Sequence, residues 1–540
     1  MRCLLAACAL LLAACSKAPA PPPAPPLPAT AAVALAAPIV RAPAPKVCNP
    51  EAPIPPQCYT RTAGAANPCW TCHTTRNGNN LKGDWTLQEV YAFSDAGLEN
   101  HWKTLFEDPR PGIASISDAA MRSYLKQDNL GPWLASQPRG APILDWSKGF
   151  DAEGFLRDGS GWRAVRYQPF PGTFWPTNGA SDDIYIRLPA AFRNSADGRP
   201  SKAIYQANLA VLEAAMSVAD TISDTKLKRR VEPVDERLVA HDLDGDGALG
   251  MASRIAGLPP RYFGAAAAEP VLRWVYPTGT EFIHTVRYLD PDAAGWLSPR
   301  VKEFRYSIKF SSPNSHGRAA AYKESEEEKR IGRLPWFATG EHGGLRNTLG
   351  WEYRGWIEAV DGSLRAQDHE ETLSCMGCHG GIGITVDSSF GLPRKVPGAA
   401  GWAVQSLDGL KDIPQAGHPE PEVLTYFKRV GGGDEFRGNA EILQRFFPKG
   451  RLDEASVRRA AVGGDADLRH LLLPSPERAM ALNKAYWLLV RDQRFKQGRM
   501  PVLSPAGNVL KQVENGDTEL RAKNRIHSDG RLWLDWPESP

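Results

Sequence analysis

The sequence predicts a mixed fold that is mainly α, with loop-rich regions and two helical segments that flank a central α+β insertion. Three observations lead to this prediction. The 540 residues include 46 Pro and 49 Gly, which favours long loops and modest regular structure. Runs of β type are concentrated in residues 136–365, whereas residues 366–540 carry mostly helical apolar patterns. The 42% hydrophobic and 23% charged residues are typical of a folded protein with a substantial core.

Residues 1–15 have the pattern of a bacterial export signal. Arg2 supplies a positive charge, and residues 4–14 form an apolar run that is too short to span a membrane, for which roughly 20 residues are needed. The sequence Leu-Ala-Ala-Cys at positions 12–15 resembles the lipobox of bacterial lipoproteins. This resemblance implies that Cys15 becomes the lipidated first residue of the mature chain. The alternative is an ordinary cleaved signal in which Cys15 has no role.

A Pro/Ala-rich tether follows at residues 16–47. Pro-rich chain adopts extended polyproline II at about 3.1 Å per residue, so the tether would hold a folded body some tens of Å from a membrane. Simple disorder is the alternative. Nothing after Cys15 is apolar enough to cross a bilayer, so we expect attachment by a lipid anchor alone, on the periplasmic side. Ser16 after the lipidated cysteine favours the outer membrane over the inner one.

Two copies of the pattern C-x-x-C-H are the most specific feature of the chain. Each copy has two cysteines and a histidine: Cys69, Cys72 and His73, then Cys375, Cys378 and His379. This is the attachment motif of c-type haem. Two thiols one helical turn apart bond to the two vinyl groups of one haem, and the following histidine is an axial ligand of the iron. We therefore expect two covalently bound haem groups, with His73 and His379 as iron ligands.

Zinc binding and disulfide bonds are the alternatives for these cysteines. Four-Cys zinc ribbons place the second pair about 15–20 residues after the first, whereas here more than 300 residues separate the pairs. Neither alternative requires a histidine after each pair. The motifs resemble those of bacterial di-haem c-type cytochromes. That resemblance implies cytochrome-c-like helical haem segments at residues 48–135 and 366–540, on either side of the insertion at residues 136–365.

Local patterns predict individual elements within these segments. In the first haem segment, Asp84 is expected to cap a helix over residues 84–91. Alternating and apolar runs predict strands in the insertion, and apolar residues at helical spacing predict helices there and in the second haem segment. The expected strands cover residues 183–188, 270–276, 281–289 and 301–310, and the expected helices cover residues 201–222, 422–430, 435–447 and 476–495.

Cys48 and Cys58 are left over in an oxidising compartment. The Pro-rich segment between them is prone to turns, so a disulfide that closes this small loop is expected. Two free thiols are the alternative.

Whether each iron has a second ligand from the protein distinguishes an electron-transfer protein from an enzyme. Two protein ligands per haem favour electron transfer, whereas an open position allows a substrate to bind. Met500, which precedes Pro501, is the candidate for the second haem, and His101 or Met121 is the candidate for the first. Each of these residues has an ordinary core or surface role as its alternative.

A possible calcium loop lies in the insertion. Asp242, Asp244 and Asp246 occupy positions 1, 3 and 5 of an EF-hand-like pattern, and the carbonyl of Ala248 would add a ligand. The usual Glu at position 12 is replaced by Ser253. A polar surface turn is the alternative.

These features favour a di-haem c-type cytochrome that transfers electrons outside the cytoplasm to redox partner proteins. The alternative is a di-haem redox enzyme, peroxidase- or oxygenase-like, with one open iron, because the chain is long for two electron-carrying haems. A binding module with a redox tail is a third hypothesis. The formal net charge of +3 excludes a nucleic-acid partner argued from bulk charge.

Overall fold

The computed structural model of the chain describes residues 47–77, 83–137, 144–172, 175–218, 228–330, 334, 336–432 and 438–537. The predicted signal peptide with Cys15, and the tether before residue 47, lie outside the described residues. Val47–Pro540 form one compact unit.

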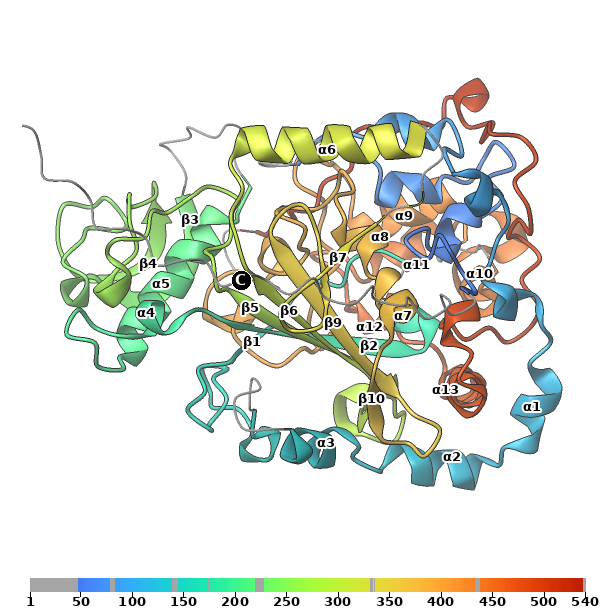
Figure 1. Cartoon of the computed structure of the whole chain (residues 1–540), viewed down its shortest axis with the longest axis horizontal. Coiled ribbons are helices and arrows are strands. Elements are labelled where there is room, and N and C mark those ends of the chain that lie inside the picture. Colours follow the sequence, from blue (N-terminus) through green and yellow to red (C-terminus); the bar gives the residue numbers. More distant parts are fainter. Residues whose placement is uncertain are drawn as a thin grey trace, which may run out of the picture. The chain divides into compact units, whose positions relative to one another are not determined.

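The centre of this unit is an antiparallel sheet, in which eight strands fall within the described part of the chain (Figure 1). Their order is β1-β2-β5-β6-β9-β8-β7, and β10 also pairs with β9. The strands are β1 (Arg163–Val165), β2 (Ala180–Arg187), β5 (Glu281–Leu289), β6 (Leu297–Lys309), β7 (Ala338–Thr339), β8 (Leu345–Arg346), β9 (Trp351–Glu358) and β10 (Leu364–Ala366).

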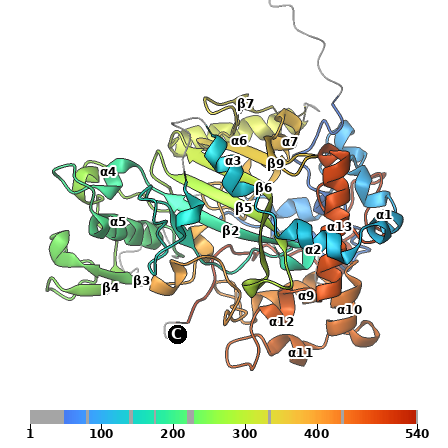
Figure 2. The same cartoon turned by 90° about the horizontal axis from the view of Figure 1, so that it is seen from below.

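Most of the helices are short and surround this sheet. They are α1 (Arg110–Ser115), α2 (Asp118–Leu125), α3 (Leu130–Ser136), α4 (Ala190–Arg193), α5 (Lys202–Ala215), α6 (Ser315–Arg330), α7 (His369–Leu373), α8 (Met376–His379), α9 (Glu422–Val430), α10 (Ala440–Phe446), α11 (Glu454–Arg458), α12 (Arg469–Leu472) and α13 (Pro476–Asp492). A second sheet pairs β3 (Lys228–Asp235) with β4 (Met251–Ala256). Figures 1 and 2 place this small sheet with α4 and α5 at one end of the unit, and α9 to α13 at the other.

The mainly α fold expected from the sequence is wrong. Helices make up 33% and strands 19% of the structure, and the large antiparallel sheet is its organising element. The sheet dominates because β2, β5, β6 and β9 are long and pair along most of their length. The C-x-x-C-H motifs, which were expected on two helical segments beside an insertion, lie instead on the 3-10 turn Pro68–Thr71 and on the one-turn helix α8.

Several individual elements agree with the sequence patterns, and two do not. The strand at residues 281–289 and the helix at residues 422–430 have the expected bounds. Residues 270–276 form no strand, since Trp274 has a φ of 58°, which interrupts extended backbone. Residues 84–91 form only a 3-10 turn, and Asp84 does not cap it because its carboxylate bonds to His73 instead.

The alternation of side chains divides β5 and β6 between two faces of the sheet. The register pairs His284 with Arg305, so both side chains point to the same face. Phe304, the neighbour of Arg305, points to the opposite face, where its ring centroid lies 5.0 Å from that of Trp133 on α3. One face therefore packs on α3, and the other is left for the site described below.

The N-terminal and C-terminal parts of the unit interlock. Thr60 forms a β-bridge with Val509, and Glu99 forms another with Gln512. The chain after α13 thus runs back along the segment that carries the first C-x-x-C-H motif. The two expected haem segments share one core, and each is incomplete without the other.

A buried ion pair ties the loop after α8 to the start of α9. The guanidinium of Arg394 and the carboxylate of Glu422 are 1% and 0% exposed, respectively, with an N···O distance of 2.5 Å. Arg394 also donates to the backbone carbonyls of Gln168, Pro169 and Leu532. The charge is therefore compensated by ionic and neutral partners, as a buried cation requires.

Asp412 is a buried carboxyl group close to this ion pair, and it predicts a pH dependence of stability. It is 1% exposed and accepts a hydrogen bond of 3.0 Å from the amide of Val423. Burial, followed by the nearby charge of Glu422, raises the pKa of Asp412 to about 8. An unfolded aspartate titrates near pH ~4, so the folded state binds the proton more tightly. Stability should fall as the pH rises from about 4 to about 8, by at most about 1.4 kcal/mol per pH unit.

Asp412→Asn removes this titration while keeping an oxygen for the amide of Val423. The difference in thermal midpoint between the variant and the wild type should therefore shift in favour of the variant between pH 5 and pH 8. Asp95→Asn, a charge change of the same size at an exposed position, is the control and should follow the wild-type profile. Parallel profiles for Asp412→Asn and the wild type would contradict the prediction.

Candidate functional site

The first C-x-x-C-H motif folds as a single turn. The 3-10 turn Pro68–Thr71 carries its start, and the amides of Cys72 and His73 both donate to the carbonyl of Cys69, at 3.2 and 2.9 Å. The two cysteines and the histidine therefore lie together on one turn, as their spacing predicts.

The imidazole of His73 is held by a buried carboxylate. Its Nδ1 lies 3.1 Å from Oδ2 of Asp84, whose side chain is 3% exposed. Asp84 also accepts hydrogen bonds from the amides of Thr74, at 3.0 Å, and Gly383, at 2.9 Å. These bonds fix the carboxylate beside the ring. We assign the proton to Nδ1, which donates to Asp84, so that Nε2 carries the lone pair.

The second motif occupies α8 and the residue before it. The amide of His379 donates to the carbonyl of Cys375 at 3.1 Å, which closes the turn that carries both cysteines. Gly377 lies between them, and a Cβ atom at that position would come within 2.0 Å of the carbonyl oxygen of Pro53. A residue without a side chain is therefore needed for the segment around Pro53 to pack against the motif.

His379 has a neutral partner where His73 has a charged one. Its Nδ1 lies 2.7 Å from the carbonyl oxygen of Ser388, and its ring centroid is 4.5 Å from that of Tyr353. Burial lowers the pKa of His379 to about 4, so the ring is neutral near pH 7. With Nδ1–H donating to Ser388, Nε2 is free to act as a metal ligand.

The two motifs meet in space although they are far apart in the sequence. The amide of Ile384 donates to the carbonyl of Cys72 at 3.1 Å, and Asp84 bonds to both His73 and the amide of Gly383. The pKa of the Cys72 thiol is raised well above its usual value, first by burial and then by the nearby thiol of Cys378. The first motif and the segment after it are thus in direct contact, through hydrogen bonds, with the chain that follows the second motif.

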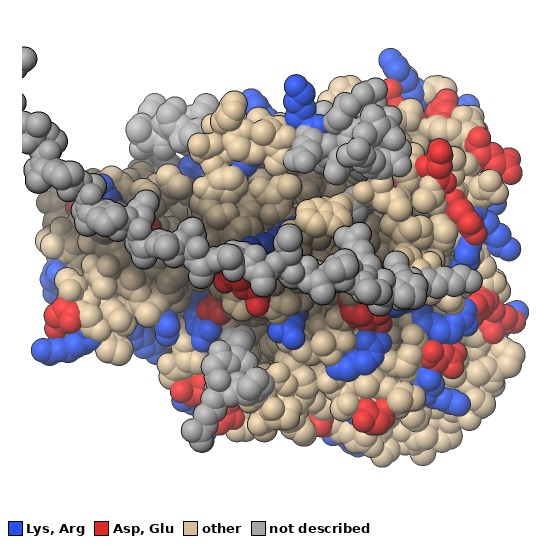
Figure 3. Space-filling view, viewed as in Figure 1, with Lys and Arg blue, Asp and Glu red and all other residues tan. Residues whose placement is uncertain are grey.

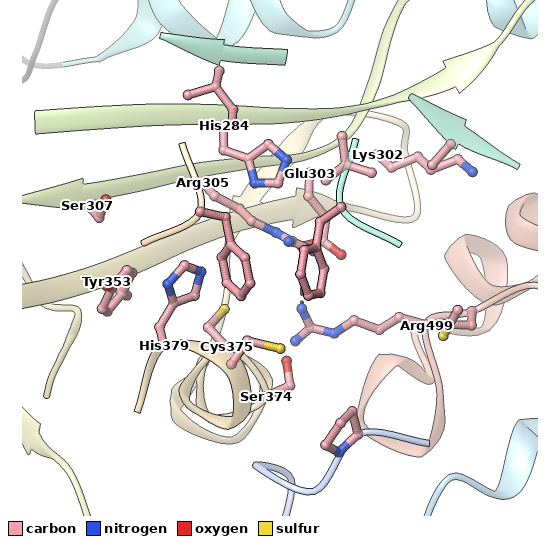
Figure 4. A pocket seen from close by; sticks show the side chains of 18 of the residues that line it. His284, Lys302, Glu303, Arg305, Ser307, Tyr353, Ser374, Cys375, His379 and Arg499 are labelled. Carbon is pink, nitrogen blue, oxygen red and sulfur yellow. Dashed lines mark hydrogen bonds and ion pairs between the residues drawn. The ribbon is translucent and has the colours of Figure 1, made fainter. Parts of the chain in front are cut away.

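A cavity of about 280 Å³ opens beside the second motif (Figure 4). A buried water occupies only about 10–15 Å³ on this measure, so the space can hold an organic group of considerable size. One wall is the free face of the main sheet, with His284, Glu303 and Arg305, and Cys375 and His379 lie opposite. Apolar and aromatic side chains complete the lining, including Phe170, Phe282, Tyr353 and Phe390.

The cavity lining is rich in positive charge. Of its described residues five are basic and one is acidic: Lys302, Arg305, Arg354, Arg394 and Arg499, with Glu303. Oε2 of Glu303 accepts from Nε of Arg305 at 2.9 Å and from Nη1 of Arg499 at 3.4 Å. Burial acts to raise the pKa of Glu303, but these two guanidinium groups lower it to about 2. The outer face in Figure 3, in contrast, has acidic and basic side chains interspersed.

The structure separates the candidates for the second axial ligands. Met500 lines the cavity together with His379, and its Sδ accepts from Nε2 of Gln57 at 3.4 Å. His101 bonds through Nε2 to the carbonyl of Ala96 at 2.9 Å. Met121 is fully buried in a different apolar cluster, which forms between α2 and α13. Only Met500 therefore lies in a cavity with the motif to which the sequence analysis assigned it.

Several residues at this site were missed by the sequence analysis. Asp84 is close to His73 in the sequence, and its carboxylate was a local signal that was interpreted as a helix cap. His284 lies in the cavity, with Nε2 3.2 Å from Oδ2 of Asp182. Neither His284 nor Arg305 has a local signal, because only the pairing of β5 with β6 brings them to the second motif.

The structure brings together a different set of carboxylates at the possible calcium loop than the sequence predicts. Oxygen atoms of Glu236, Asp242 and Asp244 lie within 4.8 Å of one another, which the described residues show for no other set of three potential metal-ligating side chains. Asp246 is not part of this group. Glu236, which precedes the loop, joins Asp242 and Asp244 in this group, and its carboxylate also accepts hydrogen bonds from the amides of Leu243 and Gly250. Calcium binding, with the carbonyl of Ala248 as a ligand, stays a prediction.

The structure shows no disulfide between Cys48 and Cys58, which the sequence predicts as a pair. The backbone amide of Cys48 donates to Glu370 of α7 at 3.2 Å, whereas Cys58 packs against the main core and is an electrostatic neighbour of Cys72. The two residues are thus held by different neighbours.

Comparisons with known proteins give a family but no activity. A family model described as "-like lipoprotein" matches residues 42–157 and 150–461. An uncharacterized lipoprotein of Aquifex aeolicus (strain VF5) is 33% identical over 541 residues, which cover 86% of this chain and 89% of the relative. No solved structure matches. Within the described ranges, no helix has the length and apolar character needed to cross a membrane.

Proposed function

Because the chain belongs to this family of lipoproteins, we propose that it is a lipid-anchored di-haem c-type cytochrome that transfers electrons outside the cytoplasm. The observation that carries the proposal is the meeting of the two C-x-x-C-H motifs. Cys72 and Ile384 share a hydrogen bond of 3.1 Å, although the motifs are more than 300 residues apart in the sequence. Two one-electron centres must be close if electrons are to pass between them within one chain. Lipidation of Cys15 belongs to the proposal, since the matched residues begin after it.

The residues present fit two haem groups. Each motif places two thiols and a histidine on one turn, and each histidine has Nδ1 bonded to an oxygen, which directs Nε2 to a metal. Beside the second motif, the aromatic lining suits a flat apolar ring, and Arg305 and Arg499 suit its carboxylates. When bound, the haem iron would supply a one-electron couple between its oxidised and reduced states.

The geometry does not favour zinc binding by the cysteines of the two motifs. A structural zinc site needs four ligands around one point. In the described part of the chain, no three cysteines or histidines of the motifs have their ligand atoms within 4.8 Å of one another. The group that meets this distance is the acidic one that contains Glu236. The motifs are adjacent but separate, as two haem sites would be.

A di-haem redox enzyme is the second candidate function, and the cavity favours it. The space beside His379 holds His284 and several basic side chains, which would suit a small polar or anionic substrate. In this case the iron at the second motif would keep one position open for the substrate. In a protein that only transfers electrons, the same basic side chains would pair with the carboxylates of the haem.

Carbon monoxide binding separates these functions. For electron transfer, the reduced full-length protein should show low-spin bands that carbon monoxide leaves unchanged. If Met500 is the second ligand of the iron that His379 binds, Met500→Ala should allow that haem to bind carbon monoxide. His284→Ala tests in the same way whether His284 is the second ligand. Met251→Ala is the control, because Met251 is 60% exposed. Carbon monoxide binding by the wild-type protein would contradict electron transfer as its sole role and favour the enzyme.

A further inference from the structure

We propose that the two haem sites have unequal reduction potentials, with the lower potential at His73, so that electrons pass from the first motif to the second. This inference rests on the proposed function and adds a direction to it. It comes from the different partners of the two histidines and from the charges that surround them.

At the first motif, the histidine is bonded to a buried negative charge. Asp84 is 3% exposed by its side chain and lies 3.1 Å from Nδ1 of His73. Two backbone amides, of Thr74 and Gly383, hold the carboxylate in place. A carboxylate that accepts the Nδ1 proton makes the imidazole a stronger electron donor through Nε2. It therefore stabilises the oxidised, more positive iron and lowers the reduction potential of this site.

At the second motif, the histidine is bonded to a neutral carbonyl and the nearby charge is positive. Nδ1 of His379 donates to Ser388 over 2.7 Å. Arg305 and Arg499 both line the adjacent cavity, and they share the single carboxylate of Glu303. Two fixed cations against one anion disfavour the more positive, oxidised iron and raise the potential.

Other charged groups at the second motif do not reverse this balance. Burial lowers the pKa of Lys302 to about 7, so its amine is only partly charged near pH 7. Asp182 is paired with His284 at 3.2 Å. Arg394, which also lines the cavity, is compensated by Glu422. The net positive charge of the cavity beside His379 therefore comes from Arg305 and Arg499, with Arg354 as a further cation of the lining.

A short connection joins the two sites. The carbonyl of Cys72, in the first motif, accepts from the amide of Ile384, a few residues after the second motif. Asp84 itself bridges His73 and Gly383. An electron that enters at the first motif thus has a hydrogen-bonded route toward the site of higher potential.

A spectroelectrochemical titration of the full-length, haem-loaded protein tests the inference. The wild type should titrate in two separate one-electron steps. Asp84→Asn should raise the lower midpoint and leave the upper one in place, because the amide oxygen can still accept from the backbone but no longer carries a charge. Asp84→Glu, which keeps the carboxylate, should return the lower midpoint toward the wild-type value. Arg305→Gln should lower the upper midpoint alone.

The control is Glu89→Gln, which removes one negative charge at a carboxylate that pairs with the exposed guanidinium of Arg521. It should leave both midpoints unchanged. A single midpoint in the wild type, or a shift of the upper midpoint in Asp84→Asn, would overturn the inference. Haem content per chain is measured first on every variant. A wild type without two attached haems would overturn the proposed function, whereas two haems of equal potential would overturn only the direction of transfer.

Discussion

A variant with both Cys375→Ser and Cys378→Ser should carry one covalently attached haem per chain where the wild type carries two. The second motif then has no thiol to bond to a vinyl group, whereas Cys69 and Cys72 are intact. The pyridine haemochrome absorbance per chain, measured after extraction with acidified acetone, should fall by half. The remaining haem should show the lower of the two midpoints, because its histidine is the one bonded to Asp84.

The matched control replaces the other two cysteines of the folded unit. Cys48→Ser with Cys58→Ser should keep both haems, since both residues lie outside the motifs. The reciprocal variant, with Cys69→Ser and Cys72→Ser, should lose the haem of lower midpoint. An unchanged haem content after the loss of both Cys375 and Cys378 would show that the second motif does not attach haem.

Arg394→Met should destabilise the protein by about 3–5 kcal/mol, which is the range for breaking a buried ion pair by removing one partner. The substitution leaves Glu422, which is 0% exposed by its side chain, with an uncompensated charge. It also removes the donor to three backbone carbonyls that join the sheet region, the loop after α8 and the C-terminal chain. Denaturant unfolding measures this loss as a lower midpoint.

Two comparisons separate the charge from the packing. Adding Glu422→Gln to Arg394→Met removes the unpaired charge and should recover part of the lost stability. Arg110→Met breaks a solvent-exposed pair with Asp108 and should leave the unfolding free energy nearly unchanged. If Arg394→Met and Arg110→Met behave alike, the buried pair does not hold this part of the fold.

Local sequence signals predicted the parts of the site that a single turn can build. The C-x-x-C-H spacing placed each histidine and its cysteines on one turn, and both motifs have that geometry. The alternation at residues 281–289 predicted β5 with its bounds. These predictions succeed because the governing interactions lie within a few residues of each other.

The predicted fold class is wrong because the fold depends on contacts between segments that are distant in the sequence. Strand β2, the consecutive strands β5 and β6, and strand β9 come from three separate parts of the chain, and their pairing is what makes a sheet the centre of the molecule. The helical patterns of the last segment are genuine, but most of its helices are short, and the long helix α13 packs against β5 of the sheet. Local propensity carries no information on which strands will pair.

The site has the same division between local and distant contacts. Asp84 was within reach of local reasoning, since a carboxylate follows His73 closely in the sequence. Arg305, Arg499 and Ser388 reach His379 or its cavity only through sheet pairing and the path of the C-terminal chain. For the same reason, the sequence placed the two motifs near opposite ends of the folded body, whereas their hydrogen-bonded segments lie together.

The haem content of the purified wild-type protein tests the central claim most directly. The account predicts an intense Soret band and a pyridine haemochrome that corresponds to two haems per chain, with neither removed by acidified acetone. A colourless protein, or haem that the solvent extracts completely, would contradict it. The paired cysteines would then serve another purpose, and the contact between the two motifs would no longer be evidence for electron transfer.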